Sequence, residues 1–190
     1  MIRFQTVQSK VIYRGRAFNV RKDEVRLPNG GTTNLDIVEH VDAVTILPLD
    51  DEGQIWLVRQ YRHPAGIEIL ELPAGILDEG ESPLSCAHRE IQEEIGMGAR
   101  RLEKIGEYFL APGYSTEYMH VYLAMDLFPS VLPHDEDEFL SVVRYPLPRI
   151  FDAVRSGEIQ DAKTLASLYL AQPFLKTSGR VLPPHGILRI

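Results

Sequence analysis

The chain has 190 residues, 44% of them hydrophobic, which is enough to bury one full core in a single main domain. Its formal net charge of -7 argues against a protein that binds nucleic acid or an anionic membrane through its charge, because both need clustered lysine and arginine. Cys86 is the only cysteine, so no intrachain disulfide can form, and residues 1–20 lack a long apolar run, so we expect a cytoplasmic protein with no nucleic-acid or membrane partner.

Residues 1–42 are expected to form a small antiparallel sheet appended to the main domain. Short β-like runs at 18–27 and 32–40 are joined by residues 28–31 (PNGG), a composition typical of a hairpin turn. Two or three strands alone bury too little surface to be stable, so this sheet must pack on the main domain or on a second copy of the chain. We favour the second copy, which predicts a homodimer.

The main domain is expected to span residues 43–178, followed by a loosely ordered tail at 179–190. Runs that favour strand lie at 44–49, 54–61, 101–110, 117–127 and 139–146. Helices are predicted at 83–95, at about 148–156 and at about 162–175. This order of elements predicts an α/β protein with a mixed sheet between helices.

The first predicted helix has well-defined ends. Ser82 is a favoured N-cap, Pro83 suits the first helical position, and Gly96 suits a left-handed terminus. Four apolar residues fall at helical spacing on one face, namely Leu84, Ala87, Ile91 and Ile95. The glutamates of the helix are expected to point to another face, so that one face packs on the sheet and the other binds.

The glutamates in and before this helix carry the predicted chemistry. Glu90 and Glu94 are one helical turn apart, so their carboxylates can hold the same cation or a close pair of cations. Glu93 lies beside them, four residues after Arg89, whose guanidinium can pair with it and hold it in place. Glu81 sits just before the helix, where the preceding loop can turn it toward the same place. Carboxylates this close repel one another unless a positive charge lies among them, so the cluster predicts a divalent metal site.

Taken singly, each of these residues could be an ordinary solvated helix charge. Together they match the string G-x5-E-x7-R-E-I-x-E-E-I-G-M over residues 75–97, and this segment resembles the Nudix box. The resemblance implies the Nudix fold, an α/β/α sandwich, and hydrolysis of a nucleoside diphosphate linked to another group, with magnesium or manganese. The metal ligands that it implies are Glu90, Glu94, Glu81 and the carbonyl of Ala74. It makes Glu93 a ligand or a base, oriented by Arg89.

The sequence around the box resembles the ADP-ribose pyrophosphatase branch of this family. The marker of that branch, a proline about fifteen positions beyond the box, is matched by Pro112. Other similar segments lie at 13–16, 37–40, 60–64, 71–75 and 111–117. The resemblance therefore implies hydrolysis of ADP-ribose to AMP and ribose 5-phosphate, and of related nucleoside diphosphate sugars such as GDP-mannose.

The same resemblance implies a set of substrate contacts. Arg16 and Asp36 would face the nucleoside or the terminal ribose, with Asp36 supplied by the partner subunit of a homodimer. Arg62, Gly113 and Glu117 would line the diphosphate and the sugar. On structural grounds alone, Arg62 could equally be a surface charge after a strand and Asp36 a solvated strand residue.

A glutamate beyond the box is expected to act as general base on the attacking water. Glu138 matches this place best and Glu136 is the second choice, although an acidic run such as 135–138 is usually a solvated loop. A carboxylate can take a proton from water here because a bound metal lowers the pKa of that water.

Three other functions stay open at this point. The chain could prefer GDP-mannose or another nucleoside diphosphate sugar, could cleave a dinucleoside polyphosphate, or could be a non-catalytic sensor that binds ADP-ribose to regulate a partner. The intact box argues against the sensor, and the segments around the box argue against the dinucleoside polyphosphate.

Overall fold

A computed structural model describes residues 3–134 and 139–177 of the chain. The two candidate bases, Glu136 and Glu138, and the predicted tail at 179–190 lie outside the described residues. Within the described residues, no helix combines the length and the apolar character that a bilayer span requires.

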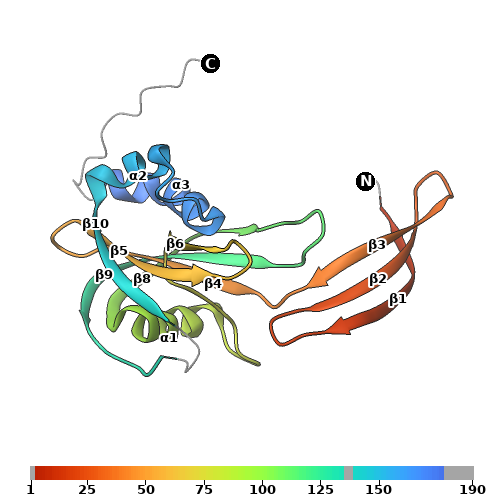
Figure 1. Cartoon of the computed structure of the whole chain (residues 1–190), viewed down its shortest axis with the longest axis horizontal. Coiled ribbons are helices and arrows are strands. Elements are labelled where there is room, and N and C mark those ends of the chain that lie inside the picture. Colours follow the sequence, from red (N-terminus) through yellow and green to blue (C-terminus); the bar gives the residue numbers. More distant parts are fainter. Residues whose placement is uncertain (1–2, 135–138, 178–190) are drawn as a thin grey trace, which may run out of the picture.

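Three antiparallel strands form the predicted N-terminal sheet, in the order β1-β2-β3. They are β1 (Gln5–Arg14), β2 (Asn19–Arg26) and β3 (Thr32–Glu39). The hairpin between β2 and β3 turns at the predicted segment, where Gly30 has a φ of 86°, a conformation that favours glycine. β1 lies before the β-like runs of the sequence and was not predicted. Almost all of its residues are exposed, so no buried face marks it as a strand. Figure 1 shows this sheet extending away from the rest of the chain.

Two further sheets build the main part of the molecule. The four-stranded sheet has the order β7-β4-β9-β8 and is mixed, because β4 runs parallel to β9 and antiparallel to β7. Its strands are β4 (Ala43–Pro48), β7 (Ala74–Ile76), β8 (Met97–Phe109) and β9 (Tyr118–Pro129). The antiparallel three-stranded sheet has the order β10-β5-β6 and contains β5 (Gln54–Arg62), β6 (Ile67–Glu71) and β10 (Leu140–Pro146). The five strand runs predicted in the main domain are confirmed, whereas β6 and β7 were missed because they are only five and three residues long.

The helices lie on both sides of these sheets. They are α1 (Pro83–Ile95), α2 (Ile150–Ser156) and α3 (Ala162–Thr177), with a 3-10 turn at Leu147–Arg149 before α2. In Figure 1, α1 lies on one side of the strands, and α2 and α3 lie on the other side. This arrangement confirms the predicted α/β/α sandwich.

A hydrophobic core fills the space on each side of the strands. Val44 and Ile46 of β4 pack in the core that contains α1, whereas Leu47 packs in the core under α2 and α3. A strand buried on both faces needs apolar residues at almost every position, which explains the uninterrupted apolar run of β4. β4 is therefore one of the strands that tie the two cores together.

The predicted ends of α1 are confirmed. The Ser82 hydroxyl accepts the N–H of Ser85 at 3.1 Å, and Gly96 closes the helix in the left-handed region at φ 67°. The prediction for Leu84 was wrong, because this side chain is 45% exposed. The buried arc of α1 is rotated toward Glu90 and Glu94, which leaves Leu84 at its edge.

Candidate functional site

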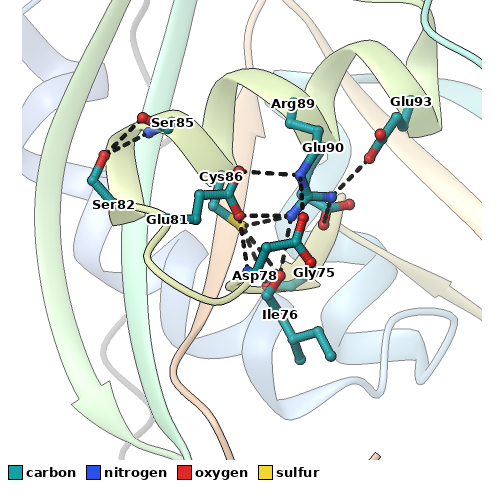
Figure 2. Close-up of polar contacts among 10 residues, drawn as sticks. All are labelled: Gly75, Ile76, Asp78, Glu81, Ser82, Ser85, Cys86, Arg89, Glu90 and Glu93. Carbon is teal, nitrogen blue, oxygen red and sulfur yellow. Dashed lines mark hydrogen bonds and ion pairs between the residues drawn. The ribbon is translucent and has the colours of Figure 1, made fainter.

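The Arg89 cluster, defined as Glu81, Arg89, Glu90 and Glu93, lies where α1 passes the loop that follows β7 (Figure 2). The Nε and Nη2 groups of Arg89 donate to the two carboxylate oxygens of Glu81, at 3.1 and 2.9 Å. Its Nη1 group donates to Glu90 at 2.6 Å and to Glu93 at 2.8 Å. The predicted pairing of Arg89 with Glu93 is confirmed, and the same guanidinium also gathers two other glutamates of the box.

Backbone groups of the loop complete this cluster. Arg89 Nη2 also donates to the carbonyl of Ile76 at 3.1 Å, and the N–H of Asp78 donates to Glu81 at 3.1 Å. The hydrogen bonds to Glu81 raise the pKa of Arg89, and the bonds from Arg89 hold the pKa of Glu81 below its ordinary value. Arg89 and Glu81 are therefore both charged at neutral pH.

The two main metal-ligand candidates are buried, which corrects the prediction that they lie on a separate face. Glu90 is 6% exposed and Glu94 is 3% exposed. The N–H of Ala74 donates to Glu94 at 3.1 Å, so the start of β7 lies directly against this carboxylate. This cover has no signal in the sequence, because β7 has only three residues.

Gly75 lets the backbone of β7 lie close to the carboxylate of Glu90. A Cβ atom built on Gly75 would lie 1.8 Å from Oε1 of Glu90, far inside van der Waals contact. Only glycine lets the β7 backbone come this close to the carboxylate. The first position of the box is thus explained by the room that Glu90 needs.

The donor set fits a hard divalent cation. Among the described residues, no three His, Cys, Asp or Glu side chains already close around one metal position, and Arg89 holds three of the glutamates concerned. Carboxylate and carbonyl oxygens are the ligands that magnesium and manganese prefer, and two buried carboxylates one helical turn apart need positive charge nearby. Glu81, Glu90, Glu94 and the backbone carbonyl of Ala74 are the candidate oxygen ligands for such a cation.

A second charged group, which the sequence did not predict, links Arg62 to α3. We call it the Glu71 cluster, and it consists of Arg62, Glu71, Asp161 and Lys163. Glu71 is 1% exposed and accepts two hydrogen bonds from Arg62, at 2.7 and 2.9 Å, and one from Lys163 at 3.1 Å. The pKa of Arg62 is raised mainly by its hydrogen bond to Glu71 and more weakly by the charge of Glu94. The Glu71 cluster is therefore within electrostatic reach of Glu94.

Asp161 fixes the start of α3 and, through it, the segment between β6 and β7. Its Oδ2 atom accepts the N–H of Thr164 at 2.9 Å and the Thr164 hydroxyl at 2.8 Å, and Lys163 donates to its Oδ1 atom at 2.7 Å. The Thr164 hydroxyl in turn accepts the N–H of Leu72 at 2.9 Å. Burial raises the pKa of Asp161, but the charge of Lys163 and the hydrogen bonds outweigh burial, so this pKa is lowered.

The remaining predicted substrate residues lie toward the N-terminal sheet. Gly113 and Glu117 belong to the connection between β8 and β9, which bonds to β3 through the N–H of Val38 and the carbonyl of Tyr114 at 2.8 Å. Asp36 lies on β3 opposite Lys22 of β2, and Arg16 lies between β1 and β2. The structure thus gathers Glu81, Arg89, Glu90 and Glu93 tightly and bonds Arg62 to Glu71, whereas Arg16 and Asp36 belong to the projecting sheet.

Comparison with known proteins places these features in a family context. The profile of the NUDIX domain matches residues 39–168, and that of the nucleoside diphosphate sugar hydrolase N-terminal domain matches residues 4–34. The chain is 39% identical to an ADP-ribose pyrophosphatase of Bacillus subtilis (strain 168) over 172 residues, which is 88% of this chain and 92% of the relative. It is 31% identical to a GDP-mannose pyrophosphatase of Yersinia enterocolitica over 159 residues, which is 77% of this chain and 83% of the relative.

A solved structure supports the same relationship. The crystal structure of an ADP compounds hydrolase superposes with a TM-score of 0.85 at 30% identity, over 94% of this chain and 97% of the other. The NUDIX match includes every residue of the Arg89 cluster and of the Glu71 cluster.

Gly75→Ala should disturb the candidate metal site, because the added Cβ atom would displace the Glu90 carboxylate. We expect the affinity for Mn²⁺, measured by titration calorimetry, to fall more than about tenfold. Gly31→Ala is the matched control, because its Cβ atom would meet only a side-chain oxygen of Asn29, at 3.3 Å. An unchanged Mn²⁺ affinity in Gly75→Ala would show that Glu90 does not need this room.

Asp161→Asn should lower the free energy of unfolding by about 1–2 kcal/mol at neutral pH, because it removes a charged partner of Lys163. The pKa of Asp161 is lowered from 3.8 on folding. Its contribution to the free energy of unfolding is therefore fully present above pH 3.8, and it is lost as the pH falls through the lower pKa of the folded state. The pKa of Lys163 is raised from 10.5 on folding. Its contribution to the free energy of unfolding is therefore fully present below pH 10.5, and it is lost as the pH rises through the higher pKa of the folded state.

Urea denaturation at a series of pH values measures this effect. The difference between the wild type and Asp161→Asn should be constant between these limits and should shrink below pH 3.8. Asp152→Asn removes an exposed partner of Arg155 and should have little effect at any pH. A difference of equal size at pH 3 and pH 7 would contradict the assignment.

Proposed function

Because the chain belongs to the NUDIX family, we propose that it is a magnesium-dependent pyrophosphohydrolase that cleaves ADP-ribose to AMP and ribose 5-phosphate. The observation that carries this proposal is the complete box, folded so that Arg89 gathers three of its glutamates beside the buried Glu94. The relative named ADP-ribose pyrophosphatase supports the choice of substrate.

The proposal assigns the metal to oxygen atoms of Glu81, Glu90, Glu94 and Ala74. A bound magnesium or manganese ion would neutralise charge on the diphosphate oxygens and make water a better nucleophile. Glu81 and Glu90 would exchange part of their bonding to Arg89 for the cation, while Arg89 keeps Glu93 in place. Arg89 is therefore assigned an orienting role, and Glu93 that of a further ligand or base.

Substrate contacts are assigned to residues outside the box. Arg62 would bind the diphosphate, because a guanidinium matches phosphate geometry and this one is within electrostatic reach of Glu94. Gly113 and Glu117 would line the diphosphate and the sugar, and Arg16 and Asp36 would meet the nucleoside or the terminal ribose. We assign the proton-abstracting role to Glu138, with Glu136 as the alternative.

A second candidate is a nucleoside diphosphate sugar hydrolase that prefers GDP-mannose. It is favoured by the similarity to a protein named GDP-mannose pyrophosphatase, which is 31% identical to this chain. The two candidates share the diphosphate chemistry and differ only in the base and sugar that are bound. Only a comparison of substrates distinguishes them.

We further propose that the chain is a homodimer formed through residues 1–42, with a hydrolase domain at 43–178 and a tail at 179–190. The N-terminal sheet exposes several large apolar side chains, among them Val7, Ile12, Tyr13 and Leu35. Light scattering should give twice the 21.5 kDa mass of one chain. A mass of 21.5 kDa at micromolar concentration would contradict the dimer.

A substrate panel tests the enzymatic proposal. The purified protein with Mg²⁺ should release AMP from ADP-ribose with a higher kcat/KM than for GDP-mannose or for a dinucleoside polyphosphate, as measured by chromatography of the products. Removal of the metal with EDTA should abolish the reaction. The proposal fails if none of these substrates gives a phosphomonoester.

Glu94→Gln supplies the internal control for that panel. We expect kcat/KM to fall more than about 100-fold, because the variant loses a charged metal ligand but keeps an oxygen that can accept the N–H of Ala74. Circular dichroism should show an unchanged fold. Glu103→Gln alters an exposed partner of Arg101 and should retain full activity. Retained activity in Glu94→Gln would remove Glu94 from the ligand set.

A further inference from the structure

The Glu71 cluster joins three separate elements around one buried carboxylate. Arg62 ends β5, Glu71 ends β6, and Lys163 stands in the first turn of α3. Arg62 donates to both oxygens of Glu71, and Lys163 donates at 3.1 Å to Oε2, the oxygen that also accepts Arg62 Nη2. A carboxylate paired with Arg62 alone could turn together with the guanidinium, whereas the bond from α3 fixes it.

Lys163 is itself held in place. Its side chain is 17% exposed, and its ammonium group also donates to Asp161 at 2.7 Å. Asp161 is anchored by the start of α3 through Thr164. Two positive and two negative side chains thus form a balanced group, which is the condition under which buried charges are tolerated.

Arg62 differs from the other members because it reaches the surface. Its side chain is 41% exposed, whereas Glu71 is 1% exposed. The two bonds to Glu71 use only part of the donor set of a guanidinium, and the charge of Glu94 acts on the same group. Arg62 is therefore anchored on one side and available to a phosphate on the other.

We propose that Lys163 is a positioning residue that fixes the guanidinium of Arg62 through Glu71 for binding of the substrate diphosphate. This inference rests on the proposed function, since it deepens the role given there to Arg62. Lys163 acts through the orientation of Arg62 and does not itself touch the substrate. A role limited to stability would leave the affinity for the substrate unchanged.

Lys163→Met should raise the KM for ADP-ribose about tenfold while kcat changes less than about threefold, because a misplaced Arg62 weakens binding. Lys163→Arg keeps the charge and the donors and should restore KM to within about threefold of the wild-type value. Lys104→Met is the matched control, since Lys104 is an exposed lysine that pairs with Glu107. If Lys163→Met does not fold, Lys163→Gln keeps a donor without the charge and takes its place.

Two further measurements separate positioning from stability. In an Arg62→Met background, Lys163→Met should change KM by less than about twofold, because its effect passes through Arg62. The Nε–H resonance of Arg62 in a ¹H–¹⁵N spectrum, assigned by its loss in Arg62→Met, should shift or broaden in Lys163→Met and stay unchanged in Lys104→Met. This second readout needs neither metal nor substrate.

The outcomes are distinct. An unchanged KM and an unchanged Arg62 resonance in Lys163→Met, or an equal rise of KM with and without Arg62, would overturn the inference. If the wild type releases no product from ADP-ribose, the proposed function fails, and the Arg62 resonance alone then decides whether Lys163 positions Arg62.

Discussion

The site depends on one electrostatic constraint, which is that carboxylates packed closely in a folded chain need positive charge among them. Arg89 meets this need by bonding to Glu81, Glu90 and Glu93 at once. The charge makes the cluster compatible with folding before any metal is involved. The same contacts keep three ligand or base candidates of the box side by side, so metal binding at the proposed site would require an exchange of partners.

The fold meets this constraint by holding the charged groups from both sides of the strands. On one side, β7 lies over α1, and Gly75 gives the Glu90 carboxylate room against the backbone. On the other side, Asp161 and Thr164 bind the start of α3 to Leu72, and Lys163 reaches Glu71. Residues 71–76 therefore connect α1 with a helix of the opposite layer. A rigid link of this kind suits a reaction that needs metal and phosphate held in register.

Local signals in the sequence were sufficient to predict the ends of α1 and the hairpin between β2 and β3. A cap residue, a proline and left-handed glycines determine the backbone within a few positions of themselves. Helical spacing was also sufficient to predict the hydrogen bond between Arg89 and Glu93. The burial of Glu90 and Glu94 was missed, because it is imposed by a three-residue strand that carries no pattern of its own. The bond between Glu71 and Lys163 spans 92 positions, and no local rule relates residues so far apart.

The overall charge of the chain shows why these local arrangements matter. A formal net charge of -7 repels a diphosphate at long range, so any attraction must come from fixed positive groups close to the bound phosphates. Arg62 would be such a group in the proposed function, but its charge is partly compensated by its bonded partner Glu71. A cation held by the glutamates of the box would supply the missing positive charge, and it would do so next to Arg62. In the proposed function the acidic cluster and the anchored arginine are therefore complementary, since the first would hold the metal and the second would orient the anion that the metal attracts.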